Sequence, residues 1–107
     1  MADPARGYRV RIQQEAVDDL DKIYRYVFQD SPLRAKAYIK NLKVKILSLR
    51  DFPRRGSRAR LLEGRAVREE IRFIEHKGYL VFYTIDKREV IILHVTGPGQ
   101  NWIRLFL

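Results

Sequence analysis

Two apolar stripes with helical spacing, separated by a short break, constrain the fold of this chain most strongly. One stripe places apolar residues at alternating intervals of four and three: Ala35, Ile39, Leu42, Ile46 and Leu49. The stripe before it has the same kind of spacing: Val17, Leu20, Tyr24, Val27 and Phe28. Each stripe is typical of an amphipathic helix that buries one face. We therefore predict two helices, one over residues 14–28 and one that ends before Pro53.

The break between the stripes is Asp30-Ser31-Pro32. Ser31 can cap a new helix, and Pro32 suits the first helical turn because the missing N–H has no partner there in any case. Since only about two residues join the helices, they must run antiparallel as a hairpin.

Apolar runs outside the helices predict four strands, over residues 8–12, 67–73, 79–85 and 90–95. The first two runs alternate with the two-residue period of a half-buried strand. Residues 79–85 are almost continuously apolar, which favours a central strand covered on both faces. We predict turns at residues 76–78 and 86–88.

The expected fold is therefore α+β, with the order strand, helix, helix and three strands (β-α-α-β-β-β). The last three strands form an antiparallel meander, and the helical hairpin packs on one face of the sheet. A chain of 107 residues has room for one core, so we expect a single domain over residues 1–107. Residues 1–7 are expected to be a flexible lead-in, and residues 98–107 an apolar tail docked on the domain.

The chain is strongly basic, with 22 Lys and Arg against 13 Asp and Glu and a net charge of +9. Such a surface attracts nucleic acid, ribosomes or an acidic protein. Residues 54–64 read as a basic surface loop. Arginines are concentrated from this loop into the next strand: Arg54, Arg55, Arg58, Arg60, Arg65, Arg68 and Arg72. If Val67, Ile71 and Phe73 face the helices, Arg68 and Arg72 point outward from the sheet.

Several classes of site find no support in the sequence. Cysteine is absent, so disulfides and thiolate metal sites are excluded. Two histidines alone make no recognisable metal site, and no glycine-rich loop suggests a nucleotide, so we expect neither metal nor cofactor. No apolar run reaches the length of a membrane span, and residues 1–7 lack the apolar core of a signal peptide. We therefore expect a cytoplasmic protein.

The chain resembles the ParE/RelE toxin superfamily of type II toxin–antitoxin systems from Tyr8 to Leu107, in element order and in local sequence. Five fragments carry the resemblance: Ala16-Val17-Asp18-Asp19-Leu20-Asp21-Lys22-Ile23, Leu49-Arg50-Asp51-Phe52-Pro53 with Arg54-Arg55-Gly56, Val67-Arg68-Glu69-Glu70-Ile71, Gly78-Tyr79-Leu80-Val81-Phe82-Tyr83, and Gln100-Asn101-Trp102. The resemblance implies a toxin that an antitoxin segment silences by folding over it.

The resemblance leaves the target open between two branches. RelE-like members cut mRNA on the ribosome without metal, whereas ParE-like members poison DNA gyrase. Gly97 and Gly99 occupy positions where the family tail usually has His and Arg, and Glu75 lies near the place of a RelE-like arginine. These departures favour a ParE-like toxin that inhibits DNA gyrase by binding. The alternatives are a ribosome-dependent mRNA endonuclease and an inactive member that only binds an antitoxin.

Candidate site residues follow from these alternatives. A gyrase poison needs no catalytic residue, whereas a nuclease needs a base, an acid and cations for the phosphorane charge. The nuclease candidates are Arg68, Arg72, His76, Tyr83 and His94, although His94 also fits a strand histidine with one hydrogen bond and His76 a solvated turn residue. Target-binding candidates are the seven arginines above with Trp102 and Arg104.

The expected partner that silences the toxin is a small DNA-binding antitoxin with an acidic segment, which makes a hetero-oligomer. The first helix carries a wider apolar surface than a core requires, since Ile23 and Tyr26 fall beside its main stripe. Antitoxin-binding candidates on that helix are Leu20, Ile23, Tyr24, Val27 and Phe28.

Overall fold

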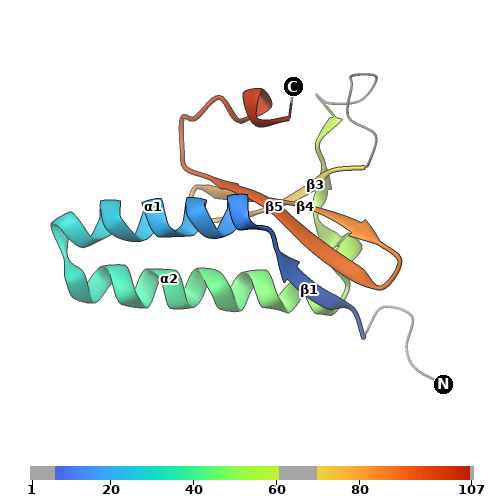
Figure 1. Ribbon diagram of the computed structural model, residues 1–107, viewed down its shortest axis with the longest axis horizontal. Coiled ribbons are helices and arrows are strands. Elements are labelled where there is room, and N and C mark those ends of the chain that lie inside the picture. Colours follow the sequence, from blue (N-terminus) through green and yellow to red (C-terminus); the bar gives the residue numbers. More distant parts are fainter. Residues whose placement is uncertain (1–6, 61–69, 107) are drawn as a thin grey trace.

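The computed structural model describes residues 7–60 and 70–106, in which a helical hairpin packs on one face of a five-stranded mixed sheet (Figure 1). The hairpin consists of α1, Gln14–Asp30, and α2, Pro32–Leu47, and a short 3-10 helix η1, Ser48–Arg50, extends it. The Ser31 side chain caps α2 by accepting a hydrogen bond from the Arg34 N–H at 3.2 Å. The predicted hairpin and its cap are confirmed.

The sheet has the order β1-β5-β4-β3-β2. The predicted antiparallel meander is confirmed as β3, Arg72–His76, β4, Tyr79–Asp86, and β5, Glu89–Thr96. β1, Arg9–Ile12, extends it on one side by pairing in parallel with β5. β2, Ser57–Arg58, pairs with β3 on the other side. The sequence predicted only a loop at β2, because two residues are too short to show a strand period.

The strand predicted over residues 67–73 differs from β3, because residues 70 and 71 are not in a strand and β3 continues past Phe73. Residues 67–69 lie outside the described residues, and β3 begins at Arg72. β3 ends at His76, which the sequence had placed in the turn. The turn is Lys77-Gly78, where both residues have positive φ, 51° and 87°. Two positive φ values match the right-handed twist of the flanking strands, so the hairpin closes in two residues.

Apolar side chains cover both faces of β4, as its sequence predicted. On the hairpin face, Val81 and Tyr83 are fully buried in a cluster with helix residues such as Leu42 and Ile46. On the opposite face, the fully buried Phe82 belongs to a second cluster that the tail covers. The tail contains the 3-10 helix η4, Trp102–Leu105. The predicted docking of the tail is confirmed for Trp102, Ile103 and Phe106, which pack against this cluster; Figure 1 shows the course of the tail after β5.

A register shift between β4 and β5 changes which β5 residues face the hairpin. Tyr83 pairs with Ile92 but Phe82 pairs with His94, so Leu93 is an additional residue in β5. As a result, Val95 joins Ile92 in the hairpin cluster. His94 lies instead beside the tail, 5.5 Å from Phe106 between ring centres.

Asp19 of α1 connects the helix to β5 beyond the point where β1 ends. Its carboxylate accepts the Val95 N–H at 2.9 Å and lies 3.0 Å from His94 Nδ1. The interpretation of His94 as a strand histidine with one hydrogen bond is confirmed. No helix within the described ranges is long and apolar enough to cross a membrane.

Candidate functional site

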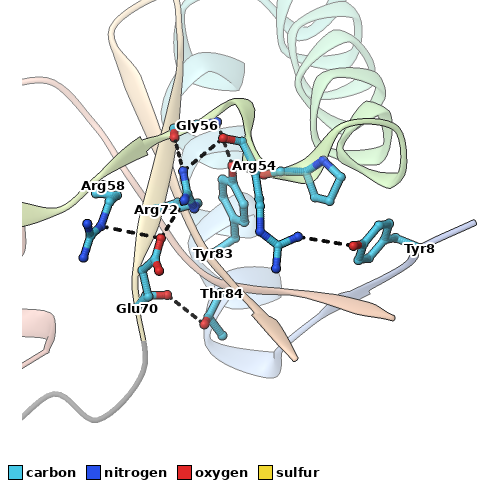
Figure 2. A network of polar contacts seen from close by, with 9 residues as sticks. Tyr8, Arg54, Gly56, Arg58, Glu70, Arg72, Tyr83 and Thr84 are labelled. Atoms are coloured by element: carbon cyan, nitrogen blue, oxygen red, sulfur yellow. Dashed lines mark hydrogen bonds and ion pairs between the residues drawn. The ribbon is translucent and has the colours of Figure 1, made fainter. Parts of the chain in front are cut away.

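The basic segment after α2, residues 54–60, is held in place by Arg72, an arginine of β3 that points inward. Arg72 of β3 donates from Nη1 to the carbonyl oxygens of Arg54, at 3.0 Å, and Gly56, at 2.8 Å (Figure 2). Its Nη2 lies 2.7 Å from the Glu70 carboxylate, and only 18% of the side chain is exposed. Two carbonyls and a carboxylate therefore engage both terminal nitrogens of Arg72.

The predicted outward orientation of Arg72 was wrong. Ile71 and Phe73 pack in the cluster beneath the tail and not against the helices. Arg72 pairs across the sheet with Tyr83, which faces the hairpin. Strand alternation separates two sets of side chains but does not say which set faces which cover, because here both faces are covered. Arg68, the other half of the prediction, lies outside the described residues.

Tyr83 lies directly beneath the basic segment and is fully buried. Its hydroxyl accepts the Gly56 N–H at 3.0 Å and donates to the carbonyl of Pro53, in the 3-10 helix η2, Pro53–Arg55 (Figure 2). Burial raises the pKa of Tyr83 above its usual value of 10.0. A neutral hydroxyl with both hydrogen bonds made inside the protein is a structural group, which is poorly placed to exchange a proton with a substrate.

The outward cations of this segment are Arg54, Arg58 and Arg60, all exposed. Arg54 donates to the Tyr8 hydroxyl at 3.3 Å, and Arg58 lies 3.6 Å from the Glu70 carboxylate (Figure 2). Arg55 is also exposed but bonds back to the Ser48 and Asp51 carbonyls at 3.3 and 3.4 Å. We call Arg54, Arg58 and Arg60 the arginine face. Arg65, also predicted as a target-binding residue, lies outside the described residues.

The described nuclease candidates do not converge on one point. Arg72 and Tyr83 pair across β3 and β4 on the hairpin face. His76 pairs with Tyr79 four residues along β3, about 13 Å away at the strand rise. His94 lies on the tail face beside Phe106. A single phosphate cannot contact groups that are distributed over two faces and both ends of the sheet.

His76 contacts α2 and is not the solvated turn residue that the sequence predicted. Its ring lies 6.1 Å from the Tyr38 ring, edge to face. His76 Nε2 and the Tyr38 hydroxyl are buried without a hydrogen-bond partner among the described residues. Burial also raises the pKa of Tyr38. Strand β3 thus continues one residue into the predicted turn, and this places His76 against α2.

A hollow separates α1 from the segment that follows β5. It has a volume of about 590 Å³, and Lys22, Ile23, Tyr26, Tyr79, Gly97, Pro98 and Gln100 line it. A neighbouring hollow of about 400 Å³ continues along the tail past Asp19, Trp102 and Arg104. The sequence did not predict these hollows, because Pro98 and Gly99 read only as a strand break.

The antitoxin-binding candidates on α1 are less exposed than the sequence predicted. Leu20 and Ile23 are buried core residues with 5% and 8% exposed, although the edge of Ile23 reaches both hollows. Tyr24 and Val27 are half-buried. Phe28 is 46% exposed and packs its ring 5.7 Å from that of Tyr24. Most of the apolar stripe that the sequence predicted as a partner-binding surface therefore packs within the domain.

The two target-binding candidates of the tail differ in exposure. Trp102 is half-buried, with its ring centre 4.8 Å from that of Phe82, and it covers the second cluster. Arg104 is exposed and lines the second hollow. Within residues 7–60 and 70–106, no three His, Asp or Glu side chains gather closely enough to hold a metal ion.

Comparison with known proteins identifies one family by its sequence model. The family model described as "ParE toxin of type II toxin-antitoxin system, parDE" matches residues 10–102. A solved chain from the "Chromosomal ParDE TA system from P. aeruginosa" is similar in fold, with a TM-score of 0.67 and 19% identity, and the match covers 86% of this chain and 97% of that one. No curated protein matches this chain.

Proposed function

The chain belongs to the ParE toxin family of type II toxin–antitoxin systems, and from this membership we propose that it inhibits DNA gyrase by binding and that a cognate antitoxin neutralises it. The observation that carries the proposal is the family match over residues 10–102, which includes every described strand except the first residue of β1. Such a toxin would act in the cytoplasm, where its target works.

The geometry supports binding over bond cleavage. Tyr83 and Arg72 use their polar atoms within the fold, and His94 lies on the opposite face of the sheet. The side chains of the arginine face are exposed, so a target can reach them. Guanidinium groups fit carboxylates and phosphates through paired hydrogen bonds, so this face suits an acidic surface or a gyrase–DNA complex.

Induction of the toxin without antitoxin tests the proposal in cells. We expect growth arrest with covalent gyrase–DNA complexes, and rescue by a small DNA-binding protein encoded beside the toxin gene. Transcript ends are mapped in the same cultures. Cuts within translated codons, without gyrase–DNA complexes, would instead establish a ribosome-dependent nuclease. Absence of arrest would establish a member that only binds its antitoxin.

Purified components test the arginine face. Replacing Arg54, Arg58 and Arg60 with alanine is expected to weaken inhibition of gyrase supercoiling by about tenfold or more, as arginines at the centre of an interface do. The matched control replaces Arg9 and Arg25, which are also exposed but lie on β1 and α1. Equal inhibition by both variants would place the gyrase contact elsewhere.

A further inference from the structure

The outward face of α2 carries a second apolar stripe, opposite the one that forms the core. Leu33 is 85% exposed, Val44 60% and Leu47 51%, and Ala37 is exposed between them. These residues recur at intervals of four and three if Lys40 is counted in the series, so they align along one side of the helix. We call Leu33, Ala37, Val44 and Leu47 the α2 stripe.

The α2 stripe is exposed because no described element covers it. The opposite side of the same helix holds Ala35, Leu42 and Ile46, all fully buried. Figure 1 shows α2 along the margin of the molecule. A single exposed leucine needs no explanation, but an aligned apolar series on a solvent-facing helix is typical of an interaction surface.

Cations border the α2 stripe on both sides. Helical geometry places Lys36 and Lys43 along one side and Arg34 and Lys45 along the other, with Lys40 within the stripe. α2 contains no Asp or Glu. The ion pairs within the described residues involve none of these four lysines, and Arg34 alone has a partner, Asp30, at 3.7 Å.

We propose that the outward face of α2 is a docking surface for an acidic amphipathic helix of a protein partner. Such a helix would place its apolar residues on the α2 stripe and its carboxylates beside the flanking cations, as facing helices do in coiled coils. The stripe extends over 15 residues, which corresponds to about 21 Å of helix axis. Four turns of a partner helix match that length.

Other occupants fit the surface less well. A second copy would set five cations of α2 against five others, which is unfavourable. Three acids of α1 already have partners: Asp21 pairs with Arg25 at 3.0 Å, Asp30 pairs with Arg34, and Asp19 bonds to β5. Nucleic acid would satisfy the lysines but would leave the central row of Leu33, Val44 and Leu47 without an apolar partner.

A synthetic peptide tests the surface directly. The probe is a fluorescent helix of about 18 residues, long enough to follow the stripe, with leucines on one side and glutamates on both flanks. Fluorescence anisotropy with the full chain is expected to show binding that weakens as salt rises. A peptide of the same composition, with its leucines distributed around the helix, is expected to bind about tenfold more weakly or less. Equal affinity for the two peptides would overturn the inference.

Two double variants localise the binding. Leu33→Ser with Val44→Ser is expected to weaken the peptide about tenfold or more, because it removes two anchors. The control, Val17→Ser with Leu105→Ser, changes apolar residues that are 43% and 44% exposed outside α2, and is expected to bind as the parent does. Equal losses in the two variants would overturn the inference. The inference would also be overturned if the α2 variant kept its affinity for the peptide but lost another interaction of the parent. That interaction could be dimerisation, binding to anionic vesicles or binding to duplex DNA.

In this protein the natural carrier of such a helix is the antitoxin, a step that rests on the proposed function. Hydrogen exchange of the full chain with its co-encoded antitoxin is expected to show protection over residues 33–47. Antitoxin binding without protection there, and undiminished in the Leu33→Ser/Val44→Ser variant, would overturn the inference and leave the proposed function intact. Failure of the toxin to arrest growth would overturn the proposed function, while the peptide titration would still report on α2.

Discussion

At the scale of single residues, Tyr83 was a candidate catalytic residue in the sequence, but in the structure it supports the basic segment. Its hydroxyl joins Gly56 and Pro53, and the neighbouring Arg72 joins Arg54 and Gly56. These bonds shape the backbone from which Arg54 and Arg58 project (Figure 2). The segment is therefore held by one phenol and one guanidinium from the sheet beneath it.

Replacing Tyr83 with Phe is expected to lower the free energy of unfolding by about 1–3 kcal/mol, because a buried N–H and a buried carbonyl lose their partner. The substitution should also reduce the loss of stability in alkali. Burial raises the pKa of Tyr83 in the folded state, so its contribution is complete below about pH 10, the unfolded value, and is lost as pH rises through the folded pKa. Urea unfolding from pH 8 to 11 measures both effects.

The control for this prediction is Tyr26→Phe, which changes a phenol that is 72% exposed. Its unfolding free energy should follow that of the parent at every pH. If Tyr83→Phe and Tyr26→Phe behaved alike, the buried hydroxyl would not be a structural support.

Gly56 is required where the backbone passes closest to Tyr83. A Cβ at this position would lie 2.2 Å from the Tyr83 hydroxyl and 2.9 Å from the Phe73 carbonyl oxygen. Gly56→Ala is therefore expected to cost about 1–3 kcal/mol in denaturant unfolding, as overpacking does. Combined with Tyr83→Phe, the cost should be smaller than the sum, because the shortest contact, with the Tyr83 hydroxyl, disappears. Strict additivity would contradict the contact.

At the scale of elements, the tail serves as the cover of the second sheet face. Trp102 lies against Phe82, and Phe106 packs on both rings. The apolar sequence of the tail had also suggested Trp102 as a target-binding residue, and that remains a prediction. Its packing means that a Trp102 variant tests folding as well as binding.

Trp102→Ala is expected to lower the unfolding free energy by about 2–3 kcal/mol, somewhat less than for a fully buried tryptophan. Thermal and urea unfolding measure this change, and Trp102→Phe should recover most of it. Arg104→Ala, an exposed neighbour on η4, is the control and should leave stability within about 0.5 kcal/mol of the parent. Unchanged stability in Trp102→Ala would mean that the tail is not a cover.

At the scale of the whole molecule, charge is distributed by element. α2 carries five cations and no acid, whereas α1 carries five acids and two cations. The arginine face lies on a third part of the surface, after η1. A molecule with a net charge of +9 attracts acidic partners at long range, and these separate faces allow different acidic surfaces to bind.

We expect capture of the toxin by its antitoxin to be electrostatically steered. The association rate constant should fall about tenfold or more between roughly 50 and 500 mM salt, because the screening length shortens from about 14 Å to about 4 Å. Stopped-flow fluorescence measures this rate. The dissociation rate constant serves as the internal comparison and should change much less. An association rate independent of salt would contradict steering.

The sequence by itself determined the helical hairpin, the meander and the family. These depend on local signals: a 4-3 repeat in α2, the Ser31-Pro32 cap, a continuous apolar strand at β4, and ordered family motifs. Only the tertiary structure decided which face each strand residue occupies. A two-residue period divides the side chains of β3 into two sets, but the position of the tail and the additional residue in β5 determine what covers each set. Arg72 and Ile71 therefore lie inward on opposite faces of the sheet, and burial against the sheet also removes Leu20 from the surface.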